Sequence, residues 1–209
     1  MTLFDISHTL SPALAVWPGD TPFRREVVLS LAAGDAVTLS TLVMSAHTGT
    51  HVDAPAHFDP TGPAIEALDL EPFWGPAQVV TVNKTAGPLT PADLAHVDLA
   101  AVPRLLVRSR SGLPDPTFFP EAFIYPAPEL AVHLARYGIR LFGSEAPSMD
   151  AVSSKDLPGH HALRRHGIAI LEGLRLTGVA DGLYELVALP LKIAGGDGSP
   201  VRAALRTLR

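Results

Sequence analysis

Strand-like runs dominate the first half of the chain, and the side chains of residues 36–46 fall on two faces with a period of two, which is typical of a β-strand. Residues 3–7 form a short apolar run. Residues 23–31 and 36–46 flank the turn sequence Ala-Ala-Gly-Asp, so they are expected to form a hairpin. Residues 47–63 contain three prolines and two glycines. This segment is therefore predicted to be a loop with short helical turns at most.

The rest of the chain alternates between strand-like and helix-like patterns. Strands are predicted at residues 77–82, 104–110, 139–143 and 168–171, a long strand broken at Pro190 at 183–193, and a last strand at 201–208. Helices are predicted at 128–137 and 162–166, and Thr90-Pro91 is a capped helix start. Residues 195–199 are predicted to form a turn. These elements predict one mixed α/β domain spanning residues 1–209.

Composition excludes several classes of protein. The chain has no cysteine, so disulfides, thiolate metal sites and a cysteine nucleophile are ruled out. The net charge is -5 and the basic residues are scattered, so no nucleic-acid partner is expected. No apolar run approaches the roughly 20 residues that cross a bilayer, and no basic leader precedes one. A cytoplasmic protein without a membrane partner is therefore expected.

Four potential metal ligands fall within eleven consecutive residues of the predicted loop: His47, His51, Asp53 and His57. Imidazole and carboxylate groups are the usual ligands for zinc where thiolates are absent, and they also suit manganese and iron. These residues could instead be surface histidines. However, the residues between them are small or apolar, and burying several imidazoles without partners would be costly. A metal site is therefore the better interpretation.

A loop of this kind needs further ligands to complete a catalytic site. The candidates in the second half of the chain are Asp150, His160, His161 and Glu172. Glu172 directly follows an apolar strand, where a carboxylate needs a partner if it is buried. Ligands from both halves of the chain would allow two metal ions to share a carboxylate, an arrangement suited to activating water.

The sequence resembles the cyclase-type metal-dependent hydrolases, and within them the bacterial kynurenine formamidase (arylformamidase) branch. The resemblance covers nearly the whole chain. It rests on the string HTGTHVDAPAHF at residues 47–58, with Trp-Pro-Gly-Asp at 17–20, Ala-Pro-Ser-Met-Asp at 146–150, and the segments around residues 154–161, 170–174 and 184–192. One departure is Glu145, where the family often has aspartate.

The resemblance implies a swivelling β/β/α fold, a homodimer or higher homo-oligomer, and two Zn²⁺ ions per subunit, with Mn²⁺ as an alternative. His47, His51 and Asp53 match the ligands of one metal, and Asp53 also reaches the second. His160 matches a ligand of the second metal, and Glu172 matches a carboxylate shared between the two. His57 matches the general acid/base, and Trp17 matches the residue that contacts the aromatic ring of the substrate. His161 competes with His160 for the ligand role.

The activity that this resemblance implies is hydrolysis of N-formyl-L-kynurenine to L-kynurenine and formate in tryptophan catabolism. Metal ions would activate the attacking water, and a histidine that does not bind metal could protonate the departing arylamine. One alternative is a related metallohydrolase that opens a cyclic amide such as isatin. A second is a non-catalytic protein that binds a metal or a small molecule, although His57, which such a protein would not need, is present.

Overall fold

Four parallel strands form the centre of the main sheet. The computed structural model describes residues 1–112 and 115–208 of the chain. The central strands are β5 (Trp74–Val82), β7 (Arg104–Ser109), β9 (Leu141–Ser144) and β10 (Ala169–Glu172). Their carboxyl ends meet at one edge of the sheet, which is where ligand sites form in open α/β sheets.

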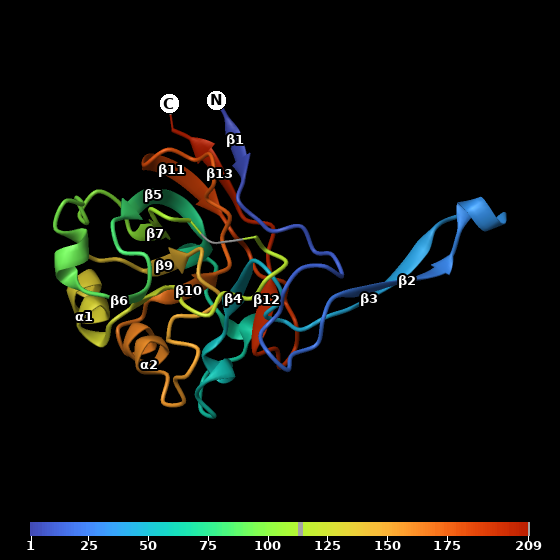
Figure 1. The fold of residues 1–209 in the computed structure, drawn as a ribbon, viewed down its shortest axis with the longest axis horizontal. Helices are drawn as coiled ribbons and strands as arrows, with labels where there is room; N and C mark the ends of the chain where they lie inside the picture. Colours follow the sequence, from blue (N-terminus) through green and yellow to red (C-terminus); the bar gives the residue numbers. More distant parts are fainter. Residues whose placement is uncertain (113–114, 209) are drawn as a thin grey trace.

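Antiparallel strands extend the sheet on both sides. On one side lie β11 (Gly182–Val187), β13 (Ala204–Thr207) and β1 (Leu3–Asp5), and on the other β4 (His51–Asp53) and β12 (Gly198–Pro200). The order across the nine strands is β1-β13-β11-β5-β7-β9-β10-β4-β12. Pairing of β1 with β13 brings the two ends of the chain together (Figure 1).

Side chains alternate between two cores on the two faces of the sheet. Val80, Leu105 and Phe142 face the helices α1 (Pro128–Arg136) and α2 (Pro158–Arg165), which cover this face side by side (Figure 1). Their neighbours in sequence, such as Leu106 and Leu141, belong to the second core. That core also contains residues of β4, β11 and β13, so the sheet curls and its outer strands share one apolar interior.

The remaining elements are short, except for one hairpin. Strands β2 (Arg24–Leu29) and β3 (Leu39–Val43) pair with each other, and Figure 1 shows them projecting from the body as an arm. Strands β6 (Gly87–Leu89) and β8 (Ile124–Pro126) form a small parallel pair. Short 3₁₀ helices occupy Leu31–Ala33, Pro55–His57, Ile65–Ala67, Glu71–Phe73 and Pro91–Leu94. The last of these has the Thr90 capping box and proline that the sequence indicated.

The mixed α/β fold, the hairpin and most strands are confirmed, and four boundaries are corrected. Residues 51–53, expected in a loop, form β4 because they pair with both β10 and β12. Helix α2 begins at Pro158 rather than at residue 162. The strand expected at 183–193 ends at Val187, before Pro190, and the turn expected at 195–199 gives way to β12 at Gly198. Within the described residues, no helix is long and apolar enough to cross a membrane.

Candidate metal centre and cavity

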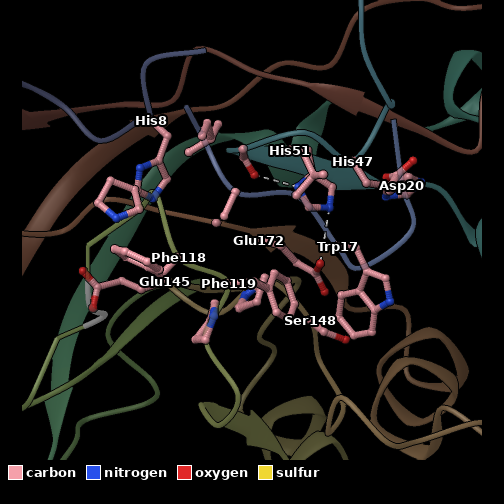
Figure 2. Close-up of a pocket in the computed structure, with 18 of the residues that line it drawn as sticks. His8, Trp17, Asp20, His47, His51, Phe118, Phe119, Glu145, Ser148 and Glu172 are labelled. Carbon is pink, nitrogen blue, oxygen red and sulfur yellow. Dashed lines mark hydrogen bonds and ion pairs between the residues drawn. The ribbon is translucent and has the colours of Figure 1, made fainter. Parts of the chain in front are cut away.

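A cavity of about 360 Å³ opens beside the carboxyl ends of β9 and β10. Glu172 ends β10, and Glu145 follows β9 directly, so the two adjacent parallel strands each deliver a carboxylate to it. The histidines of the 47–57 segment line it too, and Trp17 lies on one side of Glu172 (Figure 2). The cavity therefore gathers residues from both halves of the chain.

Strand pairing explains how the buried acids meet. In the antiparallel register of β4 and β10, Glu172 lies opposite His51, and Asp53 lies opposite Ile170. Because side chains alternate along a strand, His51, Asp53 and Glu172 share the face of the sheet that α2 covers. Val52 and Leu171 point the other way, into the second core. One residue of slip in the register would reverse this arrangement.

Two histidines face these acids through the same ring nitrogen. Nε2 of His51 lies 3.3 Å from Oε2 of Glu172 and 3.4 Å from Oδ1 of Asp53. Nε2 of His160, on the first turn of α2, lies 3.4 Å from Oδ2 of Asp53 and 3.5 Å from Oε1 of Glu172. The second ring nitrogen of each histidine also has a partner. Nδ1 of His51 lies 2.9 Å from the Gly49 carbonyl oxygen, and Nδ1 of His160 lies 2.7 Å from Oδ2 of Asp150. Such contacts fix ring orientation in metal-binding histidines.

The charges in this cluster are strongly coupled. Burial opposes protonation of His51, but the Asp53 and Glu172 carboxylates outweigh it and raise its pKa to about 10. Burial opposes protonation of His160 as well, but Asp150, Asp53 and Glu172 together raise its pKa to about 12. Burial acts to raise the pKa of Asp53, yet the surrounding histidines hold it well below its ordinary value. The buried Asp53 and Glu172 carboxylates are therefore stabilised by positive charge next to them, either as protons on the histidines or as bound metal ions.

The histidine rings do not satisfy all the buried carboxylate oxygens of this cluster, and a metal ion would do so. Oδ2 of Asp53 and Oε1 of Glu172 are buried, and neither has a hydrogen-bond partner among the described residues. Ligand atoms of His51, Asp53 and Glu172 all lie within 4.8 Å of one another. Orphaned buried acceptors are rare in native proteins and are expected where an ion binds. The donor set therefore fits a divalent metal.

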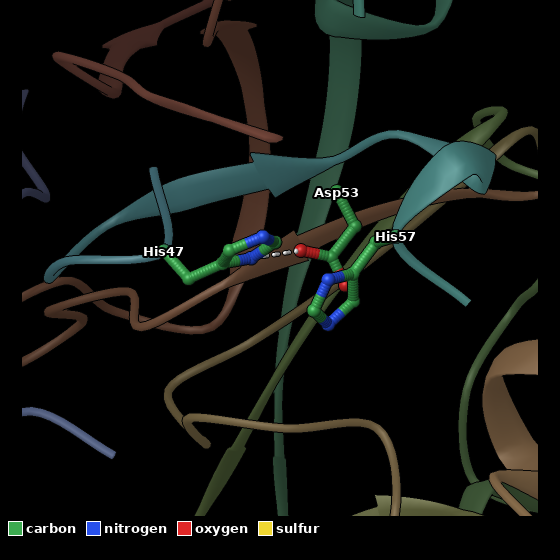
Figure 3. Close-up of side chains that lie close together, drawn as sticks. All are labelled: His47, Asp53 and His57. Carbon is green, nitrogen blue, oxygen red and sulfur yellow. Dashed lines mark hydrogen bonds and ion pairs between the residues drawn. The ribbon is translucent and has the colours of Figure 1, made fainter. Parts of the chain in front are cut away.

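A second group of potential ligands shares the Oδ1 atom of Asp53 with His51. Nδ1 of His47 lies 2.9 Å from Oδ1 of Asp53, and the ring of His57 lies against that of His47 with centroids 4.0 Å apart (Figure 3). Ligand atoms of His47, Asp53 and His57 also fall within 4.8 Å of one another. Asp53 thus contacts His47 and His51 through Oδ1 and His160 through Oδ2, so both of its oxygens face potential metal-binding histidines.

The Asp197 carboxylate lies close to both His47 and His57. Its Oδ2 atom lies 3.2 Å from Nε2 of His47 and 3.8 Å from Nδ1 of His57. Sequence reasoning missed this residue, because it regarded residues 195–199 only as a turn. A carboxylate in a glycine-rich segment was the one available signal, but the contact depends on β12 pairing with β4.

The structure brings all the predicted site residues to one place. His47, His51, His57, His160, Glu172 and Trp17 line the cavity, and Asp53 lies directly behind it among the same histidines. His161 lies elsewhere: it is not among the residues lining the cavity, and its ring contacts Phe58, with centroids 5.5 Å apart. Asp150, considered as a ligand, instead contacts Nδ1 of His160 and accepts hydrogen bonds from the backbone N–H groups of Gly159 and His160.

Aromatic residues line part of the cavity. The Trp17 side chain is 37% exposed and packs edge-on against Phe119, with ring centroids 5.2 Å apart. Phe118 also lines the cavity, and its side chain is largely exposed. Sequence reasoning identified Trp17 but neither phenylalanine, because their segment carries no recognisable pattern. Flat apolar surfaces near the metal ligands suit an aromatic ligand.

Comparisons with known proteins agree with this geometry. A protein from Salinibacter ruber described as kynurenine formamidase is 47% identical over 99% of this chain and 98% of its own length. The solved structure of a predicted metal-dependent hydrolase from Bacillus stearothermophilus is similar at 30% identity, with a TM-score of 0.82 over 98% of this chain and 97% of that one.

A further solved structure is isatin hydrolase A from Labrenzia aggregata. It is 28% identical, with a TM-score of 0.80 over 98% of this chain and 93% of that one. The family model described as "Putative cyclase" matches residues 4–151, which include the whole 47–58 motif. Its match covers well over half of the chain, and the chain therefore belongs to the cyclase family.

Proposed function

We propose that this chain hydrolyses N-formyl-L-kynurenine to L-kynurenine and formate, with residues 1–209 acting as one catalytic domain. The observation that carries the proposal is the pair of buried carboxylate oxygens on Asp53 and Glu172 that face histidines and accept no hydrogen bond from the described residues, beside an aromatic-lined cavity. Full-length relatives described as kynurenine formamidases support the choice of substrate.

His47, His51, Asp53, His160 and Glu172 would hold two Zn²⁺ ions, and manganese would suit the same ligands. When bound, such ions polarise a carbonyl group and lower the pKa of bound water toward about 7. Asp53 would be shared, because its two carboxylate oxygens contact different histidines. Elemental analysis of the purified protein identifies the metal and its stoichiometry.

His57 would move the proton during the reaction. Burial lowers its pKa, against the opposing effect of the Asp53 carboxylate, so the ring is neutral at pH 7 and can accept a proton. His57 takes a proton from the attacking water as the new C–O bond forms, and gives it to the aryl nitrogen as the C–N bond breaks. Activity should therefore fall as the pH drops through the pKa of His57.

The substrate ring would lie against Trp17. Its side chain lines the cavity close to the histidines, and Phe119 supports it edge-on. An arylformamide bound there would place its formyl group toward the metal ligands. An indole face stacks on the aromatic ring without demanding a particular substituent.

The decisive experiment compares wild-type protein with a His57→Ala variant on N-formyl-L-kynurenine. Loss of a general acid/base typically costs about 10²- to 10⁴-fold in rate. His57 is also close enough to His47 and Asp53 to be a ligand, so metal content is measured on both proteins. Retained metal with lost activity supports the acid/base role. Lost metal assigns His57 to the metal instead, and full activity contradicts both.

Hydrolysis of isatin is the second candidate, favoured by the likeness to solved isatin hydrolases. It would use the same metal ligands on a cyclic amide. Turnover of both substrates by one preparation separates the two functions. We expect N-formyl-L-kynurenine to be preferred, and a preference for isatin would contradict the proposal.

The projecting arm, formed by β2 and β3, supports a homodimer. Val28, Leu39 and Leu42 on the arm are each more than half exposed. Two-stranded hairpins are at best marginally stable alone, so this one needs a surface to pack against. A Val28→Asp, Leu42→Asp variant should be monomeric by light scattering, while Val132→Asp on α1 serves as a control outside the arm. A dimer that persists in the arm variant would contradict this assignment.

A further inference from the structure

Glu145 is a buried carboxylate that the metal centre does not use. Its residue is only 6% exposed, and its Oε1 accepts a hydrogen bond from the backbone N–H of Leu176, at 3.0 Å. Its Oε2 is buried and has no partner among the described residues. The side chain lines the cavity. One oxygen is therefore fixed by the fold, and the other is left for something that enters the cavity.

Within the part of the chain that the structure describes, no cation forms an ion pair with Glu145. The charge of Arg108 acts on Glu145, but its guanidinium donates to Thr81, the Leu176 carbonyl and Asp181. Burial raises the pKa of Glu145, and the backbone hydrogen bond and Arg108 only partly offset this effect. Among the described residues, no lysine or arginine lines the cavity. A buried carboxylate in this position gains most from a cationic ligand.

The position of Glu145 defines a second end of the cavity. In Figure 2, Glu145 lies near His8 and Phe118, whereas Trp17 lies on the opposite side of Glu172. Burial first, and the charge of Arg175 second, lower the pKa of His8, so neither favours a positive charge on this histidine.

We propose that Glu145 binds the protonated α-amino group of the substrate and thereby selects aryl formamides that carry an amino-acid side chain. This inference rests on the proposed function. The aryl ring would lie by Trp17, the formamide by the metal ligands, and the ammonium group at Oε2 of Glu145. Glu145 is a specificity-determining residue in this scheme, because it touches the substrate away from the bond that breaks.

The test compares two substrates and three variants of the metal-loaded protein. The substrates are N-formyl-L-kynurenine and its desamino analogue, 4-(2-formamidophenyl)-4-oxobutanoate, which lacks only the ammonium group. The variants are Glu145→Gln, Glu145→Asp and Asp20→Asn. Glu145→Gln is isosteric and keeps the acceptor for Leu176. Asp20 is the matched control, since it is a carboxylate that lines the cavity outside the metal ligands.

Loss of a charged hydrogen bond should lower kcat/KM of Glu145→Gln for N-formyl-L-kynurenine about 10- to 100-fold, mainly through KM. Activity toward the desamino analogue should change less than threefold, and Glu145→Asp should recover part of the preference. Asp20→Asn should keep the wild-type preference.

Three results would overturn the inference. Equal loss on both substrates would make Glu145 structural, and a selective loss in Asp20→Asn would move the ammonium site to Asp20. If wild-type protein hydrolyses neither formamide, the proposed function fails and the inference falls with it. The first two results leave the proposed function standing, so the two failures are distinguishable.

Discussion

Replacing Gly198 with alanine should disable the site through one added methyl group. A Cβ atom at this position would lie 2.7 Å from Cε1 and 3.0 Å from Nε2 of His47. Carbon atoms pack at about 3.5–4.0 Å, so the ring would have to move by about 1 Å. That shift would pull Nδ1 away from Asp53, now at 2.9 Å, and Nε2 away from Asp197, now at 3.2 Å.

A misplacement of about 1 Å in a catalytic group can cost about 100-fold in rate. We therefore expect kcat/KM for N-formyl-L-kynurenine to fall about 100-fold in Gly198→Ala, with weaker metal binding. The cost to folding stability should be that of overpacking, about 1–3 kcal/mol. Kinetics are measured with saturating metal, well below the melting temperature of each variant.

Gly196→Ala is the matched control, because it lies in the same segment but faces away from the site. Its Cβ would meet Cγ2 of Ile65 at 2.9 Å and Cβ of Ile193 at 3.2 Å, which are both apolar. It should lose stability without a comparable loss of kcat/KM. The reasoning is refuted if Gly198→Ala stays within threefold of wild type, or if Gly196→Ala loses as much activity.

Two further predictions concern the metal-binding equilibrium and the stability of the fold. Metal binding at pH 7 should release at least two protons, because His51 and His160, with pKa values of about 10 and about 12, must both lose a proton to bind metal, and His47, whose pKa the Asp53 carboxylate raises against the effect of burial, adds to this number. Affinity should therefore rise with pH, and calorimetry in buffers of different ionisation enthalpy would count the protons; zero release would contradict the assignment. Arg104→Met should lower the free energy of unfolding by about 1–3 kcal/mol, because the buried guanidinium donates to the carbonyl oxygens of Pro72 and Pro76, which would lose their partner. Denaturant unfolding measures this, with normal kcat/KM at low temperature expected and unchanged stability as the contrary result.

Local patterns were sufficient to predict the type of fold. The periodicity of β2 and β3, the apolar runs of β7 and β9, and the proline and glycine around α1 are all encoded within short windows. The same holds for the Thr90 capping box, where each group bonds a neighbour three residues away. These features appear where the sequence suggests them because few distant contacts are needed to form them.

The elements that the sequence did not predict depend on contacts between residues that are far apart in the chain. Residues 51–53 read as loop because of their flanking glycine and prolines, yet β10 and β12 hold them as a strand from both sides. Residue 198 is a glycine expected in a turn, but its pairing with Asp53 makes it part of β12. Helix α2 begins four residues early because Asp150 accepts hydrogen bonds from the N–H groups of Gly159 and His160. None of these partners is adjacent in sequence.

The candidate site likewise contains residues that a local motif identifies and residues that only the fold brings together. The 47–57 motif identifies its own histidines, since four ligands in one short segment are unusual. By contrast, the contacts of Asp197 with His47 and of Asp150 with His160 join residues that no local pattern connects. The same is true of Glu145, whose unpartnered oxygen becomes visible only in the folded cavity.

Hydrolysis of N-formyl-L-kynurenine by chelator-stripped and metal-reloaded protein tests the central claim most directly. Circular dichroism recorded on the same samples shows whether the fold persists without metal. The account predicts that stripping abolishes activity while the fold is retained, and that zinc or manganese restores it. Undiminished activity in the stripped protein, or no activity after reloading with either metal, would contradict it.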